Sequence, residues 1–406
     1  MFVRKKWLFL LILVLLVAGA GLFYSRGSTQ EYRLTPPASS EPEESSATDA
    51  VETVEPDAGP DREVVANGLQ IPWEVGFLPD GRLLVSERPG RLLLIGEDRQ
   101  IIEISGVRHI GEGGLLGFAL HPDFEKNRLV YLYLTSQENG QIVNRVERYR
   151  MDGASLSQRE VILTGIRGAS NHDGGRIAFS PDGFLYIATG DAEQAQSAQD
   201  TNSLNGKILR VREDGSIPAD NPFGNAVYSY GHRNVQGLAW DDEGRLWATE
   251  HGRSGVLSGL DELNLIEKGR NYGWPEIQGD AERPGMVRPV IHSGNETWAP
   301  SGAEFVRWAP PQRGLSEPEV LPNRRSAPKG SIFFAGLRGE SLYEAKLEEG
   351  RVVSFTRHLQ GEYGRLRAVR LGPDGYLYLT TSNRDGRGKA QSDDDRIIRI
   401  HPRILR

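Results

Sequence analysis

The chain of 406 residues contains no cysteine, which excludes disulfide bonds, thiolate metal sites and a cysteine nucleophile. It also has no surplus of basic residues. The formal net charge of -7 argues against a nucleic-acid-binding protein, which would carry a basic surplus on its binding face. The sequence has neither a His-x-x-x-His pair nor a Gly-x-Ser-x-Gly elbow, so the zinc hydrolase and serine hydrolase classes lack support.

Long apolar runs are also scarce, and the one that is present lies near the N-terminus. Basic residues at 4–6 precede an uncharged run over 7–24, which is long enough to approach a membrane span. Ala18-Gly19-Ala20 is a candidate cleavage site for signal peptidase, yet the apolar run continues beyond it, which favours an uncleaved signal anchor over 1–24. Both alternatives place the rest of the chain outside the cytoplasm, because the cationic flank stays inside. We expect a body anchored to the cell membrane by a single helix, or a secreted or periplasmic one after cleavage.

Residues 25–62 change in composition to Ser, Thr, Pro, Glu and Asp, with few apolar side chains. Such a segment cannot bury enough apolar surface to fold, so it is predicted to be a disordered acidic linker. The alternative is an extra strand on the body, which we predict to span 63–406.

The body repeats one short pattern. A hairpin built on Pro-Asp-Gly or a close variant occurs six times, at 78–85, 121–133, 181–183, 241–248, 330–336 and 373–379. After most copies comes a further strand, at 90–95, 206–211, 261–266 and 395–400. Units of several antiparallel strands that repeat in this way are typical of propeller blades. We therefore predict an all-β, six-bladed β-propeller of four-stranded antiparallel blades. A pair of β-sandwiches is the alternative, and the absence of an interdomain linker disfavours it.

One repeat also carries candidate chemistry. The stretch NHDGGRIAFSPDGFLYIATGD, residues 171–191, reads as a hairpin with His172 just before its first strand and Asp191 just after its second. Antiparallel pairing brings these two ends together, so an imidazole and a carboxylate are expected to meet at one rim of the sheet.

Three other loops are rich in polar or glycine residues, at 111–118, 230–237 and 365–367. Each has a structural alternative, respectively a turn, a network that joins two blades, and a strand with solvated arginines. Because propeller loops converge on the central channel, His172, Arg233, Arg365 and Arg367 are expected to line it together. One titratable base among fixed cations suits an anionic, planar or polycarboxylated ligand.

A further loop mixes carboxylates with glycines between residues 250 and 282, which suits a hard cation such as calcium. Acidic loops are more often simply solvated, so the spacing alone is a weak indication.

Taken together, the chain resembles the quinoprotein glucose/sorbosone dehydrogenase family of soluble aldose sugar dehydrogenases. The resemblance covers nearly the whole body and follows the family's order, through 71–91, 113–124, 172–191, 231–237, 261–275 and 365–367. It implies a six-bladed propeller that uses pyrroloquinoline quinone (PQQ) and calcium.

The resemblance also implies roles for single residues. His172 matches the base that takes the proton from the sugar's anomeric hydroxyl as hydride passes to the quinone, and Asp191 matches the carboxylate that orients it. Arg233 matches the arginine over the quinone carbonyls, while Asn234, Arg365 and Arg367 match further cofactor contacts. The implied calcium ligands are the carbonyls of Gly252 and Tyr272, the Glu262 carboxylate, and Asp280 or Glu282 as the last acidic ligand.

Two cofactor positions depart from the family pattern. Glu112 stands where many relatives have Gln and brings a negative charge toward an anionic cofactor, and Arg338 stands at a lysine position. The loop over 253–260 is also longer than is usual.

The resemblance thus implies an enzyme that oxidises the anomeric carbon of an aldose to a lactone and passes electrons to an external acceptor. A redox-inactive propeller that binds a glycan or a protein partner is the main alternative, which Glu112 and Arg338 keep open. A calcium-dependent lactonase is a third, although it would have little use for the channel arginines.

Overall fold

The computed structural model describes residues 59–255, 258–307 and 330–405. Within them the strands form six four-stranded antiparallel sheets, which we call blades 1 to 6. Blade 1 comprises β2 (Pro72–Phe77), β3 (Leu83–Glu87), β4 (Arg91–Ile95) and β5 (Arg99–Glu103). Blade 2 comprises β6 (Leu115–Leu120), β7 (Leu129–Glu138), β8 (Gln141–Asp152) and β9 (Ser155–Arg167). Blade 3 comprises β10 (Ile177–Phe179), β11 (Leu185–Ala188), β12 (Lys207–Val211) and β13 (Val227–Tyr230).

Blade 4 comprises β14 (Val235–Trp240), β15 (Leu246–Glu250), β16 (Glu262–Ile266) and β17 (Ile291–His292). Blade 5 comprises β18 (Pro300–Arg307), β19 (Gly330–Gly336), β20 (Ser341–Glu348) and β21 (Arg351–His358). Blade 6 comprises β22 (Leu366–Leu371), β23 (Leu377–Thr381), β24 (Ile397–Ile400) and β1 (Arg62–Ala66). The described helices are short: α2 (Phe124–Asn127), η1 (Ala195–Gln199) and η3 (Pro402–Leu405).

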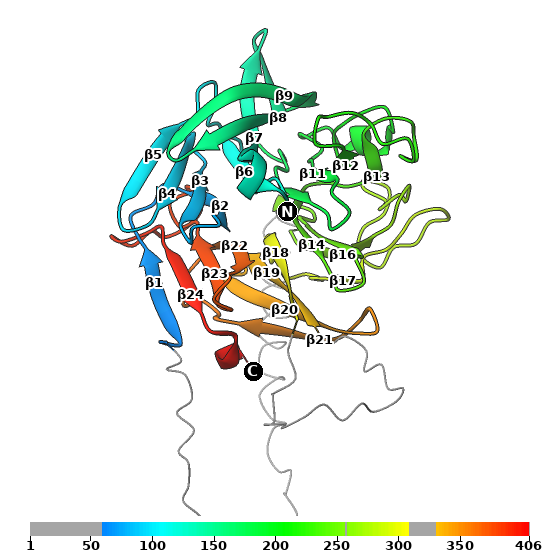
Figure 1. Cartoon of the computed structure of the whole chain (residues 1–406). Coiled ribbons are helices and arrows are strands. Elements are labelled where there is room, and N and C mark those ends of the chain that lie inside the picture. The colour runs from blue at the N-terminus through cyan, green and yellow to red at the C-terminus, as the bar shows by residue number, and fades with distance from the viewer. Residues whose placement is uncertain (1–58, 256–257, 308–329, 406) are drawn as a thin grey trace, which may run out of the picture. The chain divides into compact units, whose positions relative to one another are not determined.

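The six blades form a closed ring around a central channel (Figure 1). The first strands of most successive blades contact one another, and β22 of blade 6 lies against β2 of blade 1. Between blades 3 and 4 the contact is made by β11 and β14. Strand β1, from the start of the described chain, pairs antiparallel with β24 near its end and so completes blade 6. The predicted six-bladed propeller of four-stranded blades is therefore confirmed.

The repeated hairpins predicted from the sequence correspond to the turn between the first and second strand of a blade, as in β2–β3, β10–β11, β14–β15 and β22–β23. In blade 2 this connection contains helix α2, and in blade 5 the predicted copy forms β19 itself. The additional strands predicted after the hairpins are the third strands β4, β12, β16 and β24. Local turn chemistry thus identified the connection between the first two strands in five blades, and in blade 5 the pattern marked strand β19.

The hydrophobic core is divided among the blade interfaces. Among the described residues, each of six apolar clusters lies between two neighbouring blades. Tyr131 and Leu209, for example, pack between blades 2 and 3, and both are fully buried. Each large apolar side chain buried in this way contributes roughly 1.5–3 kcal/mol. The packed blades therefore give the loops at the channel rim a stable base.

The predicted membrane anchor and most of the predicted linker lie in residues 1–58, outside the described residues. Within the described ranges, no helix has both the length and the apolar composition needed to cross a bilayer.

Candidate active site

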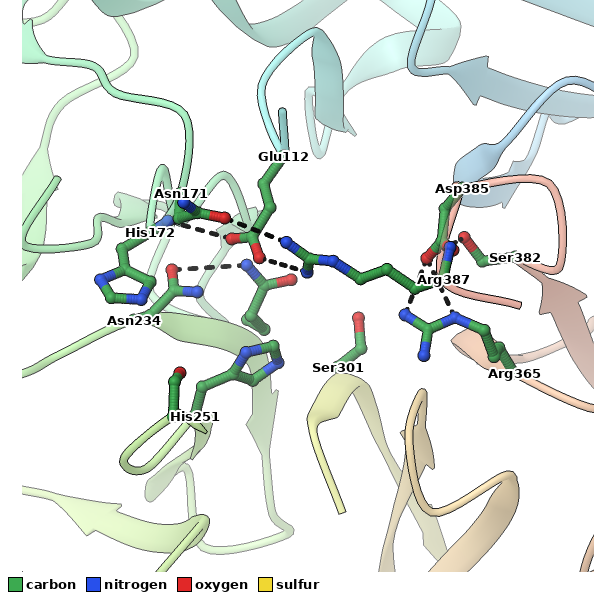
Figure 2. Close-up of polar contacts among 12 residues, drawn as sticks. Glu112, Asn171, His172, Asn234, His251, Ser301, Arg365, Ser382, Asp385 and Arg387 are labelled. Atoms are coloured by element: carbon green, nitrogen blue, oxygen red, sulfur yellow. Dashed lines mark hydrogen bonds and ion pairs between the residues drawn. The ribbon is translucent and has the colours of Figure 1, made fainter. Parts of the chain in front are cut away.

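In each blade the chain enters the first strand and leaves the second at the same rim of the channel, because the two strands are antiparallel. The predicted site residues lie at these points in different blades. Glu112 precedes β6, His172 precedes β10, Asn234 precedes β14 and Arg365 precedes β22. Figure 2 shows these four residues together around one shared space.

His172 and Asp191 meet at this rim. The imidazole Nδ1 lies 2.7 Å from Asp191 Oδ1. Asp191 is buried and has two further donors, the Trp274 indole N–H at 2.9 Å from Oδ2 and the Glu193 backbone N–H at 2.9 Å from Oδ1. A carboxylate held in this way fixes the proton on Nδ1, which leaves Nε2 of His172 as the acceptor. The arrangement is that of a general base with an orienting carboxylate.

The glycines around the His172–Asp191 pair are required for steric and conformational reasons. His172 has a left-handed backbone (φ 61°), and Gly174 and Gly175 also have positive φ. A Cβ on Gly190 would lie 1.9 Å from the His172 carbonyl oxygen and 2.9 Å from Asn234 Oδ1. The base loop therefore approaches the end of β11 too closely for any side chain at position 190.

Arg233 and Asn234 enter the same space from blade 4. Arg233 is buried, donates to the Ser254 hydroxyl at 2.8 Å, and has its guanidinium 5.3 Å from the centre of the Trp274 ring. Asn234 accepts the Gly174 N–H at 3.0 Å through Oδ1, while its buried Nδ2 has no hydrogen-bond partner. Blade 4 thus supplies one fixed cation and one unused donor.

The three arginines predicted near the cofactor differ in their surroundings. Arg367 is buried and donates through Nη1 to Gln236 Oε1 at 2.8 Å, while its Nε has no partner. Arg365 is paired with Asp385 at 2.8 Å within its own blade. Arg338 is exposed and reaches the Ser258 hydroxyl at 3.4 Å. Of these three arginines, Arg367 is the one with a buried donor that lacks a partner.

The site also contains residues that the sequence analysis did not select. Asp173 and His251 border a small cavity of about 10 Å³ together with Trp73, Glu112, Gly174, Gln236, Leu337, Arg367 and Arg387. Asp173 Oδ2 and His251 Nε2 are buried there without partners. Asp173 follows the predicted base His172, and His251 precedes the predicted ligand Gly252. Proximity in sequence to these residues was the one signal that could have identified them. Arg387 stands in a stretch without any motif.

Burial shifts both of these groups toward their neutral forms. It raises the pKa of Asp173 to about 7, although hydrogen bonds from Asn144 and Ala169 oppose the shift. Burial likewise lowers the pKa of His251 to about 3, against the influence of Glu112, so this imidazole is neutral at physiological pH.

A larger cavity, of about 610 Å³, lies at the other end of the channel. Phe118, Phe179 and Trp240 are among its lining residues. Its charged members Glu74, Glu304 and Arg370 are paired with one another. Because it lacks a base with a free nitrogen, the rim with His172 is the better candidate site despite its smaller cavity.

The acidic residues predicted as metal ligands have different surroundings. Glu262 is buried, accepts from Asn264 Nδ2 at 3.0 Å, and forms no ion pair with Lys or Arg in the described part of the chain. Burial first, and then the nearby Glu250, raise its pKa to about 8. Asp280 and Glu282 are exposed and pair with His292 at 3.2 Å and Arg288 at 2.9 Å. Among the residues described, no cluster of three His, Asp or Glu side chains suited to a metal ion is present.

The chain is similar to several known proteins. Residues 69–399 match the family model described as Glucose / Sorbosone dehydrogenase. The PQQ-bound aldose sugar dehydrogenase of Streptomyces coelicolor is 41% identical with a TM-score of 0.72, over 83% of this chain and 96% of that one. A putative glucose dehydrogenase of Thermus thermophilus is 42% identical with a TM-score of 0.74, over 83% and 98%. The aldose sugar dehydrogenase YliI of Escherichia coli is 32% identical over 80% of this chain and 90% of its own length.

Proposed function

Because the chain belongs to the glucose/sorbosone dehydrogenase family, we propose that it uses PQQ and calcium to oxidise the anomeric carbon of an aldose to a lactone. The electrons pass to an external acceptor. The observation that carries the proposal is the His172–Asp191 pair, with the Arg233 cation close enough to interact with the Asp191 charge. The buried unpaired donors of Asn234 and Arg367 accompany it.

The unused donors at this rim support the cofactor. Asn234 Nδ2 and Arg367 Nε are buried without partners, and leaving such groups unpaired is unfavourable unless a ligand satisfies them. Together with the Arg233 cation they suit a planar, polycarboxylated anion such as PQQ. These three residues would hold the cofactor, which when bound supplies the two-electron acceptor.

The protein's own residues would handle the proton. Nε2 of His172 accepts the proton of the anomeric hydroxyl, and Asp191 stabilises the imidazolium that results. Trp274 and the Glu193 N–H hold the carboxylate in place while this occurs. Arg233 provides a fixed positive charge where negative charge develops during oxidation.

The Glu262 environment is the support for calcium. A buried carboxyl without a cationic partner is stable as an anion only when a cation is bound beside it. Glu262 with the carbonyls of Gly252 and Tyr272 would hold the ion. Asp280 or Glu282 would join them only after leaving its surface ion pair.

A dye-reduction assay tests the proposal. The full chain is purified, supplied with PQQ and calcium, and given a panel of aldoses. We expect sugar-dependent reduction that needs both additions, and a loss of about 10³–10⁴-fold in His172→Gln, because general-base catalysis is removed. His358→Gln, in an ion pair on the outer strand β21, is the matched control and should retain full rate. A fully active His172→Gln variant would refute the mechanism.

One observation favours a second function, a redox-inactive propeller that binds a glycan or protein partner. The cavity beside His172 measures about 10 Å³ and is bordered by the Glu112–Arg387 ion pair. Failure of the wild-type chain to bind PQQ or to oxidise any aldose would favour this alternative.

We further propose that residues 1–24 anchor the protein to the membrane with its body outside the cytoplasm, on the basis of the cationic flank and apolar run. Recovery of the native protein from the cytosolic fraction would contradict this.

A further inference from the structure

Glu112 and Arg387 form an ion pair across the rim of the channel. Glu112 precedes β6 in blade 2, and Arg387 lies after β23 in blade 6, so blade 1 separates them along the ring. The Arg387 Nη1 to Glu112 Oε1 distance is 2.6 Å. Figure 2 shows the long Arg387 side chain extending from the side of Asp385 to that of Glu112. The pair stands between the 10 Å³ cavity beside Asp173 and His251 and a more open one of about 180 Å³.

Both members of the pair also bind the loop that carries the base. Glu112 Oε2 accepts the His172 backbone N–H at 3.0 Å, and the Glu112 N–H donates to the Ser170 carbonyl at 2.9 Å. Arg387 donates through Nη2 to Asn171 Oδ1 at 3.0 Å. Three successive residues, 170 to 172, are thus held by Glu112 of the neighbouring blade 2 and by Arg387 of blade 6, which lies opposite in the ring. The contact matters because His172 has a left-handed backbone, which persists only where its surroundings impose it.

The ion pair also compensates the negative charge of Glu112. Burial opposes ionisation of this carboxyl, but His251, Arg387 and the His172 N–H outweigh it and lower its pKa to about 2. Glu112 is therefore an anion at the edge of a space that suits an anionic ligand. Arg387 cancels that charge, and the Asp385 carboxylate in turn accepts the Arg387 backbone N–H at 2.9 Å.

We propose that Glu112 and Arg387 are positioning residues for the base: together they hold the His172 loop in its working conformation, and Arg387 neutralises Glu112 beside the cofactor cavity. The positioning half needs only the protein itself. The charge half rests on the proposed function, since it concerns an anionic cofactor.

Substitutions at positions 112 and 387 are expected to have different effects. Gln at position 112 keeps an oxygen for the His172 N–H but loses the charge, whereas Gln at position 387 leaves the Glu112 carboxylate uncompensated. The Glu112 side chain is largely buried, whereas that of Arg387 is 54% exposed. Loss of Arg387 alone therefore leaves a largely buried charge without a partner, which is more harmful than loss of both members. Arg387→Gln should therefore be worse than Glu112→Gln, and the double variant should recover.

Quenching of tryptophan fluorescence measures PQQ affinity without turnover. We expect the Kd to rise about tenfold in Arg387→Gln and about threefold in Glu112→Gln, with the double variant closer to the wild type than Arg387→Gln is. Arg307→Gln, which breaks an exposed interblade pair with Asp242, is the matched control and should not change the Kd. A double variant no better than Arg387→Gln would overturn the charge half.

Amide exchange in the ligand-free protein tests the positioning half. The chain has eight histidines, so selective ¹⁵N-histidine labelling gives a simple spectrum, in which His172→Gln identifies the His172 amide. That amide should exchange about tenfold faster in Arg387→Gln while the other histidine amides do not change, since only a local opening is expected. Unchanged exchange at His172, or equal acceleration at all histidines, would overturn it. Because no cofactor is used, this result stands even if the wild type does not bind PQQ.

Discussion

His172 and Asp173 are neighbours in sequence, yet their side chains have opposite surroundings. The imidazole binds the Asp191 carboxylate at the partly exposed rim. Asp173 is 1% exposed, accepts from Asn144 Nδ2 at 2.9 Å and the Ala169 N–H at 3.1 Å through Oδ1, and leaves Oδ2 without a partner. At this scale the sequence indicated the base, whereas the second carboxyl became visible only through its burial.

The raised pKa of Asp173 predicts how stability depends on pH. The folded state retains this proton up to pH of about 7, while the unfolded chain releases it near pH 4. The contribution of Asp173 to stability is therefore complete below pH 4 and is lost as the pH rises to about 7, a change of a few kcal/mol at most. Asp173→Asn keeps the accepting oxygen and does not titrate.

We expect Asp173→Asn to gain stability relative to the wild type by about 1–3 kcal/mol between pH 4 and pH 8 in the ligand-free protein, because only the wild type loses stability through Asp173. Denaturant titrations at several pH values measure this difference, from which groups common to both proteins cancel. A difference that does not vary with pH would contradict the assignment.

At the scale of the element, the β10–β11 hairpin carries both members of the dyad. The residue pairing from Ile177 with Ile187 to Phe179 with Leu185 brings the ends of the hairpin together. Gly190 then forms an isolated bridge with Asn234 of blade 4, so the hairpin is joined to the next blade at the site. The β10–β11 hairpin therefore determines how His172 and Asp191 meet. The Gly190–Asn234 bridge to blade 4 determines how this pair is oriented at the rim.

Gly190→Ala should displace this junction. The new Cβ would lie 1.9 Å from the backbone oxygen of His172, which cannot move aside without moving the base. We expect a loss of about 1–3 kcal/mol in stability from overpacking, and a fall in turnover larger than the fraction unfolded explains. Gly96→Ala, whose Cβ would meet only the flexible Arg82 side chain, is the matched control for both measurements. Normal turnover in Gly190→Ala would show that the close approach is not needed.

At the scale of the whole molecule, the ring depends on a strand from the other end of the chain. Residues of β1 pair with β24 from Arg62 opposite Ile400 to Ala66 opposite Ile397. Glu63 adds an ion pair with Arg399 at 2.6 Å. Without β1, β24 would become an exposed edge strand, which favours association with other chains.

Two truncated chains separate the contribution of β1 to stability from that of the residues before it. A chain that starts at Gly59 keeps β1 and should unfold at nearly the same temperature as the full chain. A chain that starts at Asn67 loses the closing strand and should lose several kcal/mol of stability, because a whole row of ladder hydrogen bonds and cross-strand pairs is removed. Thermal unfolding and size-exclusion chromatography measure both effects. Equal melting temperatures for the two truncations would show that the ring does not need β1.

The sequence by itself determined the features that depend on short range. Turn residues and alternating strands marked the inner hairpins of five blades and strand β19 of blade 5. One such hairpin brought His172 to Asp191, because antiparallel pairing joins residues close in the chain. The tertiary structure alone decided what meets across the ring. It joined Arg387 to Glu112 over 275 residues and turned Asp280 and Glu282 toward surface partners. It also buried Asp173 Oδ2 and His251 Nε2 beside the site. The physical reason is that ring closure and blade packing set these distances, and no local pattern encodes them.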